Sequence, residues 1–549
     1  MIAKTADMVD RPWLVQKFGG TSLGKLLATI CSTIIPNYNE EHRLVVVCSA
    51  LSGDTKASGT TSLLLECIEL AELGVHMQQK LLDIVHLLRD NHLAVLDSFC
   101  DSEQPASLQV CKETKSRIVT ECEGLENFLL AAQIVGELSP RAKDRVVSLG
   151  EKLSSVIVAA CLANQGIPAT AVYLDDVVAS AFGTSASDQA AAFDKLGSKF
   201  YHAIAKEIAV RIKNCGDTIP IVTGKFFGIK VGRGYSDFCA AMCAVAVEAV
   251  ELQIWKEVDG IFTADPRKIP SAQLLSSVTA DEIAELSYYG SEVLHPLTMD
   301  QIREANISFR LKNVFKPNSP GTIIDFAVNL PQTIKITPPP GVLLKGDFTV
   351  GRNDRRRPTA VTIKDDILLI NVICNRNTVS AKGIRSSILG LPPVKIHSLS
   401  ANIRDMITTS ERNVSLAVHS PGDSSAVLRL QEELKSFGSV NITENMSIVT
   451  LVGHKMRSQI GVANDALTAL AMASINIHLI SQGASEISIS FVVSANEAEP
   501  ALNAIHRDVL KIPTIEESRF RRSKQSSSVI CIWDEFWVWM MLHAETDDA

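Results

Sequence analysis

The chain has 549 residues, of which 46% are hydrophobic and 21% charged, and its formal net charge is −8. This length predicts three or four domains, and the composition is that of a globular protein able to bury a large core. The acidic balance and the pI near 5.9 argue against a nucleic-acid partner, because phosphates are bound by clustered cations.

The 12 cysteines include no CxxC pair, so the sequence predicts no zinc site and assigns no metal ligand. The N-terminal residues do not have the form of a secretory leader, and no apolar run reaches the ~18–20 residues that a membrane span needs. We therefore expect a cytoplasmic protein with free thiols and no membrane partner.

The first half of the chain alternates between predicted strands and helices. Short β-branched runs predict buried strands, and polar or small-residue stretches between them predict helices. The alternation predicts an α/β sandwich with a mainly parallel sheet over residues 12–326. In chain order, the predicted elements are strands at 13–18 and 43–49, helical structure at 60–135, a helix at 142–164, strands at 167–173 and 219–223, a helix at 237–250 and a strand at 252–256.

A proline-rich linker is predicted at 327–358, around Pro338-Pro339-Pro340. Two smaller units are predicted after it, at 359–440 and 441–515. The second has the order β-α-β-β-α of a ferredoxin-like unit. The first is irregular, since Pro392-Pro393 interrupts it. A divergent tail with three tryptophans occupies 516–549.

The first predicted strand ends in a cation, two glycines and two hydroxyls, in the run KFGGTS at 17–22. Glycines let backbone N–H groups approach phosphate oxygens, and Lys17 supplies a point charge. The spacing from Gly19 to Lys25 also fits a P-loop, but Leu26 stands where a P-loop has Ser or Thr for magnesium. We therefore expect a phosphate-binding turn of another type, with a simple tight turn as the alternative.

Three further motifs have a functional and a plain structural interpretation. In GRGYSD at 232–237, Arg233 can present a bidentate fork to a carboxylate, whereas Asp237 can equally be a helix N-cap. In the run 255–267, a predicted strand is followed by charged residues and a glycine turn, as in a loop at the edge of a nucleotide site. Glu151 follows Gly150 on a long helix, where a single glutamate is ordinarily solvated surface.

Taken together and in order, these motifs resemble those of the aspartokinases, the fungal ones above all. The resemblance covers about 13–325 and 359–512 and also includes YGSEVLHP at 289–296 and ISQGASEI at 480–487. It implies the three-layer sandwich of the amino-acid kinases as catalytic domain, followed by two ferredoxin-like ACT domains at 359–440 and 441–515. It also implies assembly into homo-oligomers through these domains and an amino-acid effector such as threonine.

The implied reaction uses ATP and Mg²⁺ to phosphorylate the side-chain carboxylate of L-aspartate, the first step toward threonine and methionine. A carboxylate with a pKa of ~3.9 is already ionised at neutral pH, so the nucleophile needs no general base. The site must instead supply positive charge and alignment for two anions.

The resemblance also implies a role for each site residue. Lys17 would stabilise the transferring phosphoryl group, and Asp237 would orient Lys17. Arg233 would hold the α-carboxylate of aspartate, and Glu151 its α-ammonium group. The remaining positions are Ser49, Ala50 and Thr55 on the substrate side, and Gly19, Gly20, Thr21, Ser22, Lys256, Glu257, Phe262, Arg267 and Glu292 on the nucleotide side.

Three features depart from the family pattern: a short loop at 225–231, the irregular stretch at 385–412 and the tryptophan-rich tail. They favour a duplicated enzyme with weak feedback, which could supply a fungal specialised metabolite such as fusaric acid. Two other readings stay open. One is an amino-acid kinase with a different acceptor. The other is a catalytically weak amino-acid sensor derived from an aspartokinase.

Overall fold

The computed structural model describes residues 11–53, 58–100, 105–224, 235–289, 296–326, 358–374, 406–409, 413–420, 422, 424–435, 438–454, 456, 459–482 and 487–512. The chain divides into two compact units. We call them the N-terminal unit and the C-terminal unit. The C-terminal unit includes two segments that precede the predicted linker, Phe262–Leu275 and Asp281–Val293.

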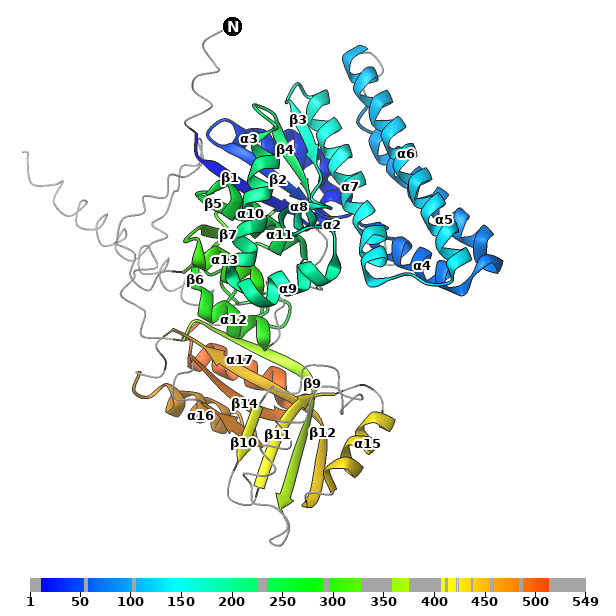
Figure 1. Cartoon of the computed structure of the whole chain (residues 1–549). Coiled ribbons are helices and arrows are strands. Elements are labelled where there is room, and N and C mark those ends of the chain that lie inside the picture. Colours follow the sequence, from blue (N-terminus) through cyan, green and yellow to red (C-terminus); the bar gives the residue numbers. More distant parts are fainter. Residues whose placement is uncertain are drawn as a thin grey trace, which may run out of the picture. The chain divides into compact units, whose positions relative to one another are not determined.

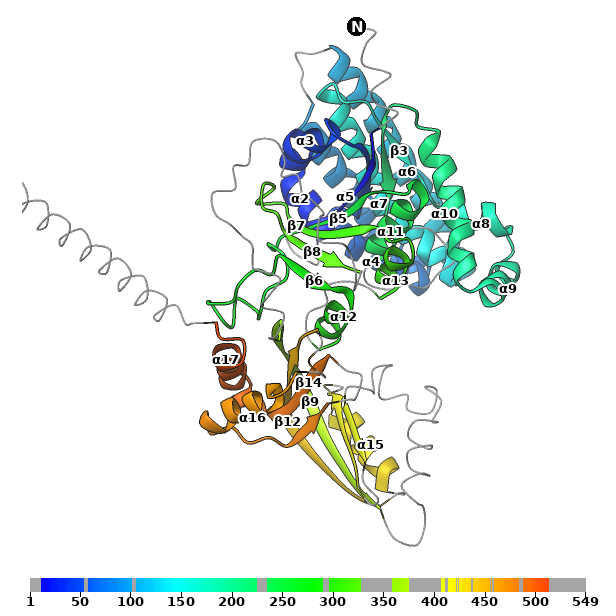
Figure 2. The ribbon, with the colours of Figure 1, turned by 90° about the vertical axis from the view of Figure 1, so that its left-hand side faces the viewer.

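An eight-stranded sheet forms the centre of the N-terminal unit, in the order β3-β4-β2-β1-β5-β7-β8-β6. All neighbouring strands are parallel except β7 and β8, which lie near one edge with β6 (Figures 1 and 2). The predicted mainly parallel α/β sheet is therefore confirmed. Its strands are β1 Trp13–Phe18, β2 Arg43–Cys48, β3 Ala169–Val172, β4 Ile219–Thr223, β5 Glu251–Lys256, β6 Ser277–Thr279, β7 Ser308–Asn313 and β8 Thr322–Asp325.

The central strands are buried on both faces, which explains their nearly continuous apolar sequences. Successive side chains along β1 alternate between the two faces. Phe18 belongs to the core that packs under the long helices, so Lys17 points to the opposite face, where α11 packs against β1. The helices of this unit are α2 Gly20–Thr29, η1 Ile30–Ile34, α3 Ile35–Asn39, α4 Thr60–Leu73, η2 Val75–Met77, α5 Gln78–Asp97, α6 Pro105–Val135, α7 Pro140–Asn164, α8 Val177–Phe182, α9 Ala186–Leu196, α10 Ser198–Lys213, α11 Tyr235–Val247 and α13 Pro296–Glu304.

The helix α7 is the one helix, among the residues that the structure describes, that is long and apolar enough to cross a membrane. Of its most apolar window, 72% is buried inside the protein, as in a core helix. This burial arises because α7 packs against β3, β4, α4 and α6.

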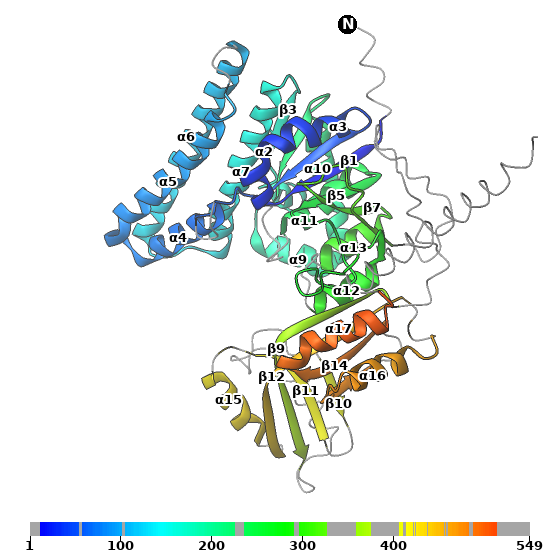
Figure 3. The same ribbon diagram turned by 180° about the vertical axis from the view of Figure 1, so that it is seen from behind.

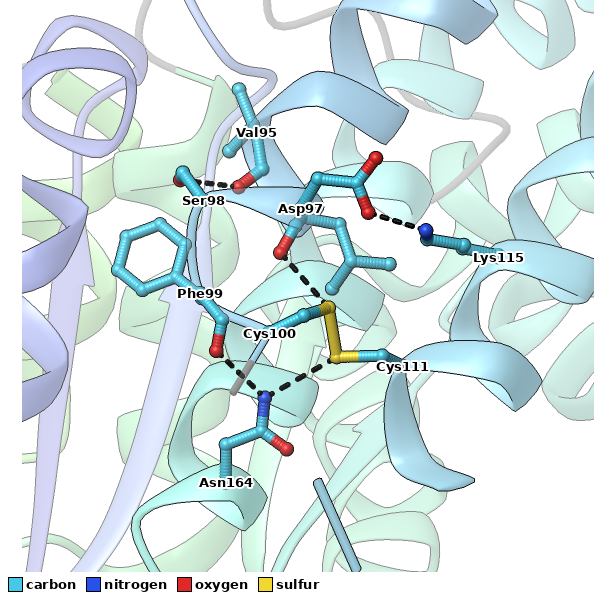
Figure 4. The surroundings of a disulfide bond; sticks show 9 residues. Val95, Asp97, Ser98, Phe99, Cys100, Cys111, Lys115 and Asn164 are labelled. Carbon is cyan, nitrogen blue, oxygen red and sulfur yellow. Dashed lines mark hydrogen bonds and ion pairs between the residues drawn. A yellow bond between two sulfur atoms is a disulfide. The ribbon is translucent and has the colours of Figure 1, made fainter. Parts of the chain in front are cut away.

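The predicted helical stretch at 60–135 forms three α-helices and the short helix η2, and α5 and α6 lie side by side (Figures 1 and 3). A disulfide joins Cys100 to Cys111 across the connection between these two helices (Figure 4). Asn164, at the end of α7, donates to the carbonyl oxygen of Phe99 at 3.1 Å and to the sulfur of Cys111 at 3.5 Å.

The expectation that all thiols are free is wrong for this pair. The eleven-residue spacing of Cys100 and Cys111 is not a recognised motif, and only the return of α6 alongside α5 brings their Cα atoms to 6.1 Å. The eight other cysteines whose side chains the structure describes are free, and seven of them are buried.

The C-terminal unit contains a six-stranded antiparallel sheet in the order β10-β11-β9-β12-β14-β13. Two strands of 15 residues, β9 and β12, pair along its centre. The predicted boundary between residues 440 and 441 lies inside β12, so both predicted ACT domains share one sheet. Its strands are β9 Ala360–Cys374, β10 Met406–Thr409, β11 Asn413–His419, β12 Gly438–Val452, β13 Leu479–Ser481 and β14 Ser488–Ser494.

Helices α16 Val462–Met472 and α17 Ala498–Asp508 cover one face of this sheet (Figure 3). The order β12-α16-β13-β14-α17 matches the β-α-β-β-α pattern predicted for the second unit. Helix α15 Ser424–Lys435 packs against the C-terminal half of β9 and the N-terminal half of β12. The unit also contains most of α12 Ala280–Tyr288.

Candidate active site

A buried ion pair lies where β1 ends. The Nζ atom of Lys17 is 2.7 Å from Oδ1 of Asp237, and each side chain is only 8% exposed. Lys17 comes from β1, and Asp237 from the first turn of α11. An acidic side chain in the first turn of a helix is stabilised by the positive end of the helix dipole. The structure therefore joins the two residues that the sequence assigned to catalysis.

Little water reaches this ion pair, because both side chains are buried. Burial raises the pKa of the neighbouring Cys48 thiol, and the positive charge of Lys17 opposes that rise. Burial, followed by a hydrogen bond with Cys243, raises the pKa of Cys239 on α11. Because water is largely excluded here, a cation held in place interacts strongly with a negatively charged group.

Helix α2 begins at Gly20, and Gly19 alone separates it from β1. The first N–H groups of a helix have no partners within it, and they suit a phosphate group. Ser22, in the first turn, is fully buried and donates to Oε1 of Glu257 at 2.7 Å. This bond joins the predicted phosphate turn to the residue that follows β5.

Close backbone packing explains two glycines of the motifs. A Cβ atom on Gly20 would lie 2.3 Å from the carbonyl oxygen of Ala50, and Ser52 donates its N–H to the carbonyl of Gly20. A Cβ atom on Gly150 would lie 2.7 Å from the Cβ atom of Ala50. The loop after β2 therefore packs directly on both the phosphate turn and α7.

The predicted substrate loop is also linked to α11. Ser49 donates to the hydroxyl of Ser236 at 2.9 Å, next to Asp237. Leu51 donates its N–H to the hydroxyl of Ser154 on α7, at 3.0 Å. Sequence reasoning missed Ser236 and Ser154, and the only signal was the position of Ser236 beside Asp237.

Glu151 lies on α7, directly after Gly150. Its negative charge contributes to the raised pKa of Cys239, and one of its carboxylate oxygens is buried. Gly150, the residue before it, packs on Ala50 in the loop after β2, so Glu151 belongs to the same end of the sheet as Lys17. An anion and a cation near one another suit the two charged ends of an amino acid.

The other predicted site residues lie at the end of β5, at the start of α2, in the C-terminal unit or outside the described residues. Lys256 is half-buried at the end of β5. Phe262 and Arg267 belong to the C-terminal unit, and Arg267 is 88% exposed and paired with Asp265. Gly19 and Thr21 lie at the start of α2. Thr55, Arg233 and Glu292 lie outside the described residues.

Chemically, the site offers a buried cation, a helix N-terminus and two carboxylates at the carboxyl end of a parallel sheet. Ligands of open α/β sheets bind at this end. The described part of the chain contains no group of three or more His, Cys, Asp or Glu side chains that could hold a metal ion. The arrangement suits transfer of a phosphoryl group rather than hydrolysis by a nucleophilic triad.

Comparisons with known proteins identify the domains and the family of the chain. The sequence profile of the Amino acid kinase family matches residues 12–313, and that of an ACT domain matches 449–509. The aspartokinase of Saccharomyces cerevisiae is 41% identical over 529 residues, covering 93% of this chain and 95% of that protein. An aspartate kinase of Gibberella fujikuroi is 35% identical over 526 residues, covering 91% and 98%.

Among solved structures, Escherichia coli aspartokinase III in complex with lysine and aspartate has the same fold. Its TM-score is 0.65 at 23% identity, and the match covers 90% of this chain and 99% of that one. The high identity to full-length fungal enzymes settles the family. This chain therefore belongs to the aspartokinases, the aspartate kinases of the amino acid kinase family.

Proposed function

We propose that this aspartokinase transfers the γ-phosphoryl group of ATP to the side-chain carboxylate of L-aspartate beside the Lys17–Asp237 pair. The observation that carries this proposal is the buried 2.7 Å contact between the two side chains. Asp237 holds Lys17 in one position, so its charge is already aligned when two anions meet. Such preorganisation avoids the cost of reorienting solvent during the reaction.

The N-terminus of α2 receives the phosphates of ATP in this proposal. Gly19, Gly20, Thr21 and Ser22 supply the backbone N–H groups, and the close contact of Gly20 with Ala50 fixes their direction. Glu257 keeps Ser22 in place and, with Lys256, lies on the nucleotide side. Phe262, Arg267 and Glu292 have nucleotide-side roles by resemblance.

Aspartate lies between opposite charges in this proposal. Glu151 meets its α-ammonium group, and Arg233 holds its α-carboxylate. Ser49 and Ala50, with Thr55, form the loop beside the reacting carboxylate. The bonds from Ser49 to Ser236 and from Leu51 to Ser154 support this role, because they hold the loop against α11 and α7.

The proposal includes Mg²⁺ as a partner of ATP. In nucleotide sites Mg²⁺ is usually held by one or two carboxylates together with phosphate oxygens and water, so no dedicated cluster of acids is needed. Asp237 is a carboxylate that would fit this requirement, since it lies where β1 leads into the proposed phosphate turn. When bound, the ion would offset negative charge on the phosphates.

The pathway and regulation are part of the same proposal. We place the enzyme in the cytoplasm, at the start of threonine and methionine synthesis, as a homo-oligomer assembled through its ACT region with threonine as candidate effector. Supply of a specialised metabolite such as fusaric acid is the second candidate. The greater identity to the S. cerevisiae enzyme, 41% against 35%, favours the general pathway.

An aspartyl-hydroxamate assay tests both the proposed reaction and the proposed regulation by threonine. The purified protein is incubated with ATP, Mg²⁺ and hydroxylamine, with L-aspartate or L-glutamate as acceptor, and with or without L-threonine. We expect hydroxamate with L-aspartate as acceptor and none with L-glutamate. If the enzyme serves the general pathway, we expect L-threonine to inhibit this reaction. Activity that threonine leaves unchanged would favour the specialised pathway, and a folded protein that forms no hydroxamate would favour the sensor.

A further inference from the structure

The turn that follows β5, residues 256–261, is held at both ends. Strands β5 and β7 are parallel neighbours. Just beyond β7, the N–H of Val314 donates to the carbonyl oxygen of Lys256 at 2.9 Å. At the other end of the turn, the N–H of Ile261 donates at 2.9 Å to the hydroxyl of Thr322, which is fully buried. The turn is therefore tied to the two strands beside β5.

The middle of the turn is held through the carboxylate of Asp259. Its Oδ1 atom accepts from the side-chain amide of Asn313 at 2.6 Å, and its Oδ2 atom lies 2.7 Å from Nζ of Lys316. The hydrogen bond with Lys316 lowers the pKa of Asp259, so this carboxylate is ionised at neutral pH. Asn313 is 4% exposed, and its own Oδ1 accepts from the N–H of Phe315 at 2.8 Å. Because Asn313 is buried and bonded through both amide atoms, it holds Asp259 in one position.

Glu257 lies in the same turn and contacts the proposed phosphate turn. One of its carboxylate oxygens accepts from the hydroxyl of Ser22 at 2.7 Å. Ser22 is fully buried, whereas Glu257 is exposed. Packing therefore fixes Ser22 but not Glu257. The position of Glu257 depends on the turn that carries it, and so on the bonds of Asp259.

We propose that Asp259 is a positioning residue for ATP, which holds Glu257 against Ser22 at the start of α2. This inference rests on the proposed function, in which α2 receives the phosphates of ATP and Lys256 and Glu257 lie on the nucleotide side. All of these residues belong to the N-terminal unit. The described residues proposed to hold aspartate follow β2 or lie on α7. Loosening the turn after β5 therefore weakens the binding of ATP and not that of aspartate.

Two variants separate positioning from a simple effect of charge. Asp259→Ala removes a negative charge, which by itself favours binding of the anionic nucleotide. Lys316→Glu makes the surroundings more negative, which by itself disfavours that binding, and it places a like charge opposite Asp259. Both variants weaken the bonds that hold the turn. Positioning therefore predicts weaker binding of ATP in both, whereas charge alone predicts changes of opposite sign.

Matched controls come from an exposed ion pair between α5 and α6, that of Asp97 and Lys115 (Figure 4). Asp97→Ala and Lys115→Glu repeat the two chemical changes there. Asp259→Asn is the conservative variant, because its side-chain oxygen can still accept from Asn313. The full-length proteins are assayed for KM of ATP, KM of aspartate and kcat, and for direct binding of the ATP analogue AMP-PNP with Mg²⁺.

We expect Asp259→Ala to raise KM for ATP and Kd for AMP-PNP by roughly five- to tenfold, the loss of about one hydrogen bond. Lys316→Glu should raise both by about threefold, since an exposed ion pair contributes less. Asp259→Asn should recover most of the affinity. KM for aspartate and kcat should stay within about twofold, and both controls should behave like the unsubstituted protein. Because Lys316 is 63% exposed, Lys316→Glu decides the sign even if Asp259→Ala does not fold.

A double variant tests the route through Ser22. Ser22→Ala removes the bond to Glu257 and should itself weaken the binding of AMP-PNP. If Asp259 acts through this bond, Asp259→Ala adds little once the hydroxyl is gone. The combined loss of affinity should then stay close to the larger of the two single losses, because changes that share one contact are not additive.

Unchanged Kd for AMP-PNP in the folded variants would overturn the inference, as would changes of opposite sign, a parallel rise in KM for aspartate or losses that multiply in the double variant. The binding measurement does not depend on turnover. A protein that binds AMP-PNP without forming hydroxamate would refute the proposed function and still decide the role of Asp259.

Discussion

Two ion pairs of similar length show how differently the same chemistry can be used in this molecule. Lys17 and Asp237, in the N-terminal unit, lie 2.7 Å apart with each side chain 8% exposed. Asp265 and Arg267, in the C-terminal unit, also lie 2.7 Å apart, but Arg267 is 88% exposed. The first pair joins a strand to a distant helix, whereas the second joins two residues of one turn.

The difference lies in the surroundings rather than in the distance. Exposed pairs are screened by water and contribute ~0–1 kcal/mol to stability. Each member of a buried pair, in contrast, is costly to leave without the other, by about 3–5 kcal/mol. The same exclusion of water that makes Lys17 dependent on Asp237 makes its charge effective toward a phosphate. Variants of these two ion pairs, and of one buried histidine, test this effect of burial.

The largest expected effect is on turnover. Lys17→Ala removes the buried cation and should lower kcat by about 10²–10³-fold, the range seen when one electrostatic donor is lost from an active site. Lys25→Ala is the matched control, because Lys25 is an exposed lysine on α2. The hydroxamate assay measures both. A Lys17→Ala enzyme within threefold of the unsubstituted rate would remove Lys17 from the mechanism.

The second effect is on stability. Asp237→Asn leaves the ammonium group of Lys17 buried without a counter-ion and should lower the free energy of unfolding of the N-terminal unit by about 3 kcal/mol. Asp265→Asn makes the same change in the exposed pair and should cost the C-terminal unit less than about 1 kcal/mol. Urea unfolding followed by circular dichroism measures both changes. Equal losses would show that burial does not distinguish the pairs.

The smallest effect concerns pH. His92 is 2% exposed, its Nδ1 lies 2.7 Å from the carbonyl oxygen of Leu88, and burial lowers the pKa of its imidazole. The folded protein then binds fewer protons than the unfolded chain below the ordinary pKa of ~6.5. The stability that neutral His92 provides is complete above that value and is lost as the pH falls through the lowered pKa.

His92→Gln should therefore flatten the decline in unfolding free energy between pH 7 and pH 5, by up to ~1.4 kcal/mol for each unit by which the pKa is lowered. His202→Gln is the control, since the side chain of His202 is 53% exposed. Thermal unfolding at a series of pH values supplies the data. A slope that His92→Gln leaves unaltered would assign the acid sensitivity to other groups.

Much of the N-terminal unit follows from its sequence. The strand that contains Lys17, the strand at 219–223 and the long helix around Glu151 are visible as apolar periodicity, because periodicity records burial. The pairing of Lys17 with Asp237 came from family resemblance and not from spacing. Periodicity shows that a residue is buried, but it does not show which distant residue it meets.

Contacts between distant segments could not be predicted for the same reason. The hydroxyl bonds from Ser22 to Glu257 and from Ser49 to Ser236 join residues about two hundred positions apart. The Cys100–Cys111 bridge depends on how α6 returns along α5. Thr263 lies inside a catalytic motif in the sequence, yet the fold places it in the core of the C-terminal unit.

The most direct test of the account is to observe the product. Protein, ATP, Mg²⁺ and L-aspartate are mixed, and phosphorus NMR follows the γ-phosphoryl group in parallel samples of the unsubstituted and Lys17→Ala proteins. We expect an acyl-phosphate signal that requires aspartate and is nearly absent with Lys17→Ala. Consumption of ATP to inorganic phosphate alone, or an acyl phosphate that Lys17→Ala forms equally well, would contradict it.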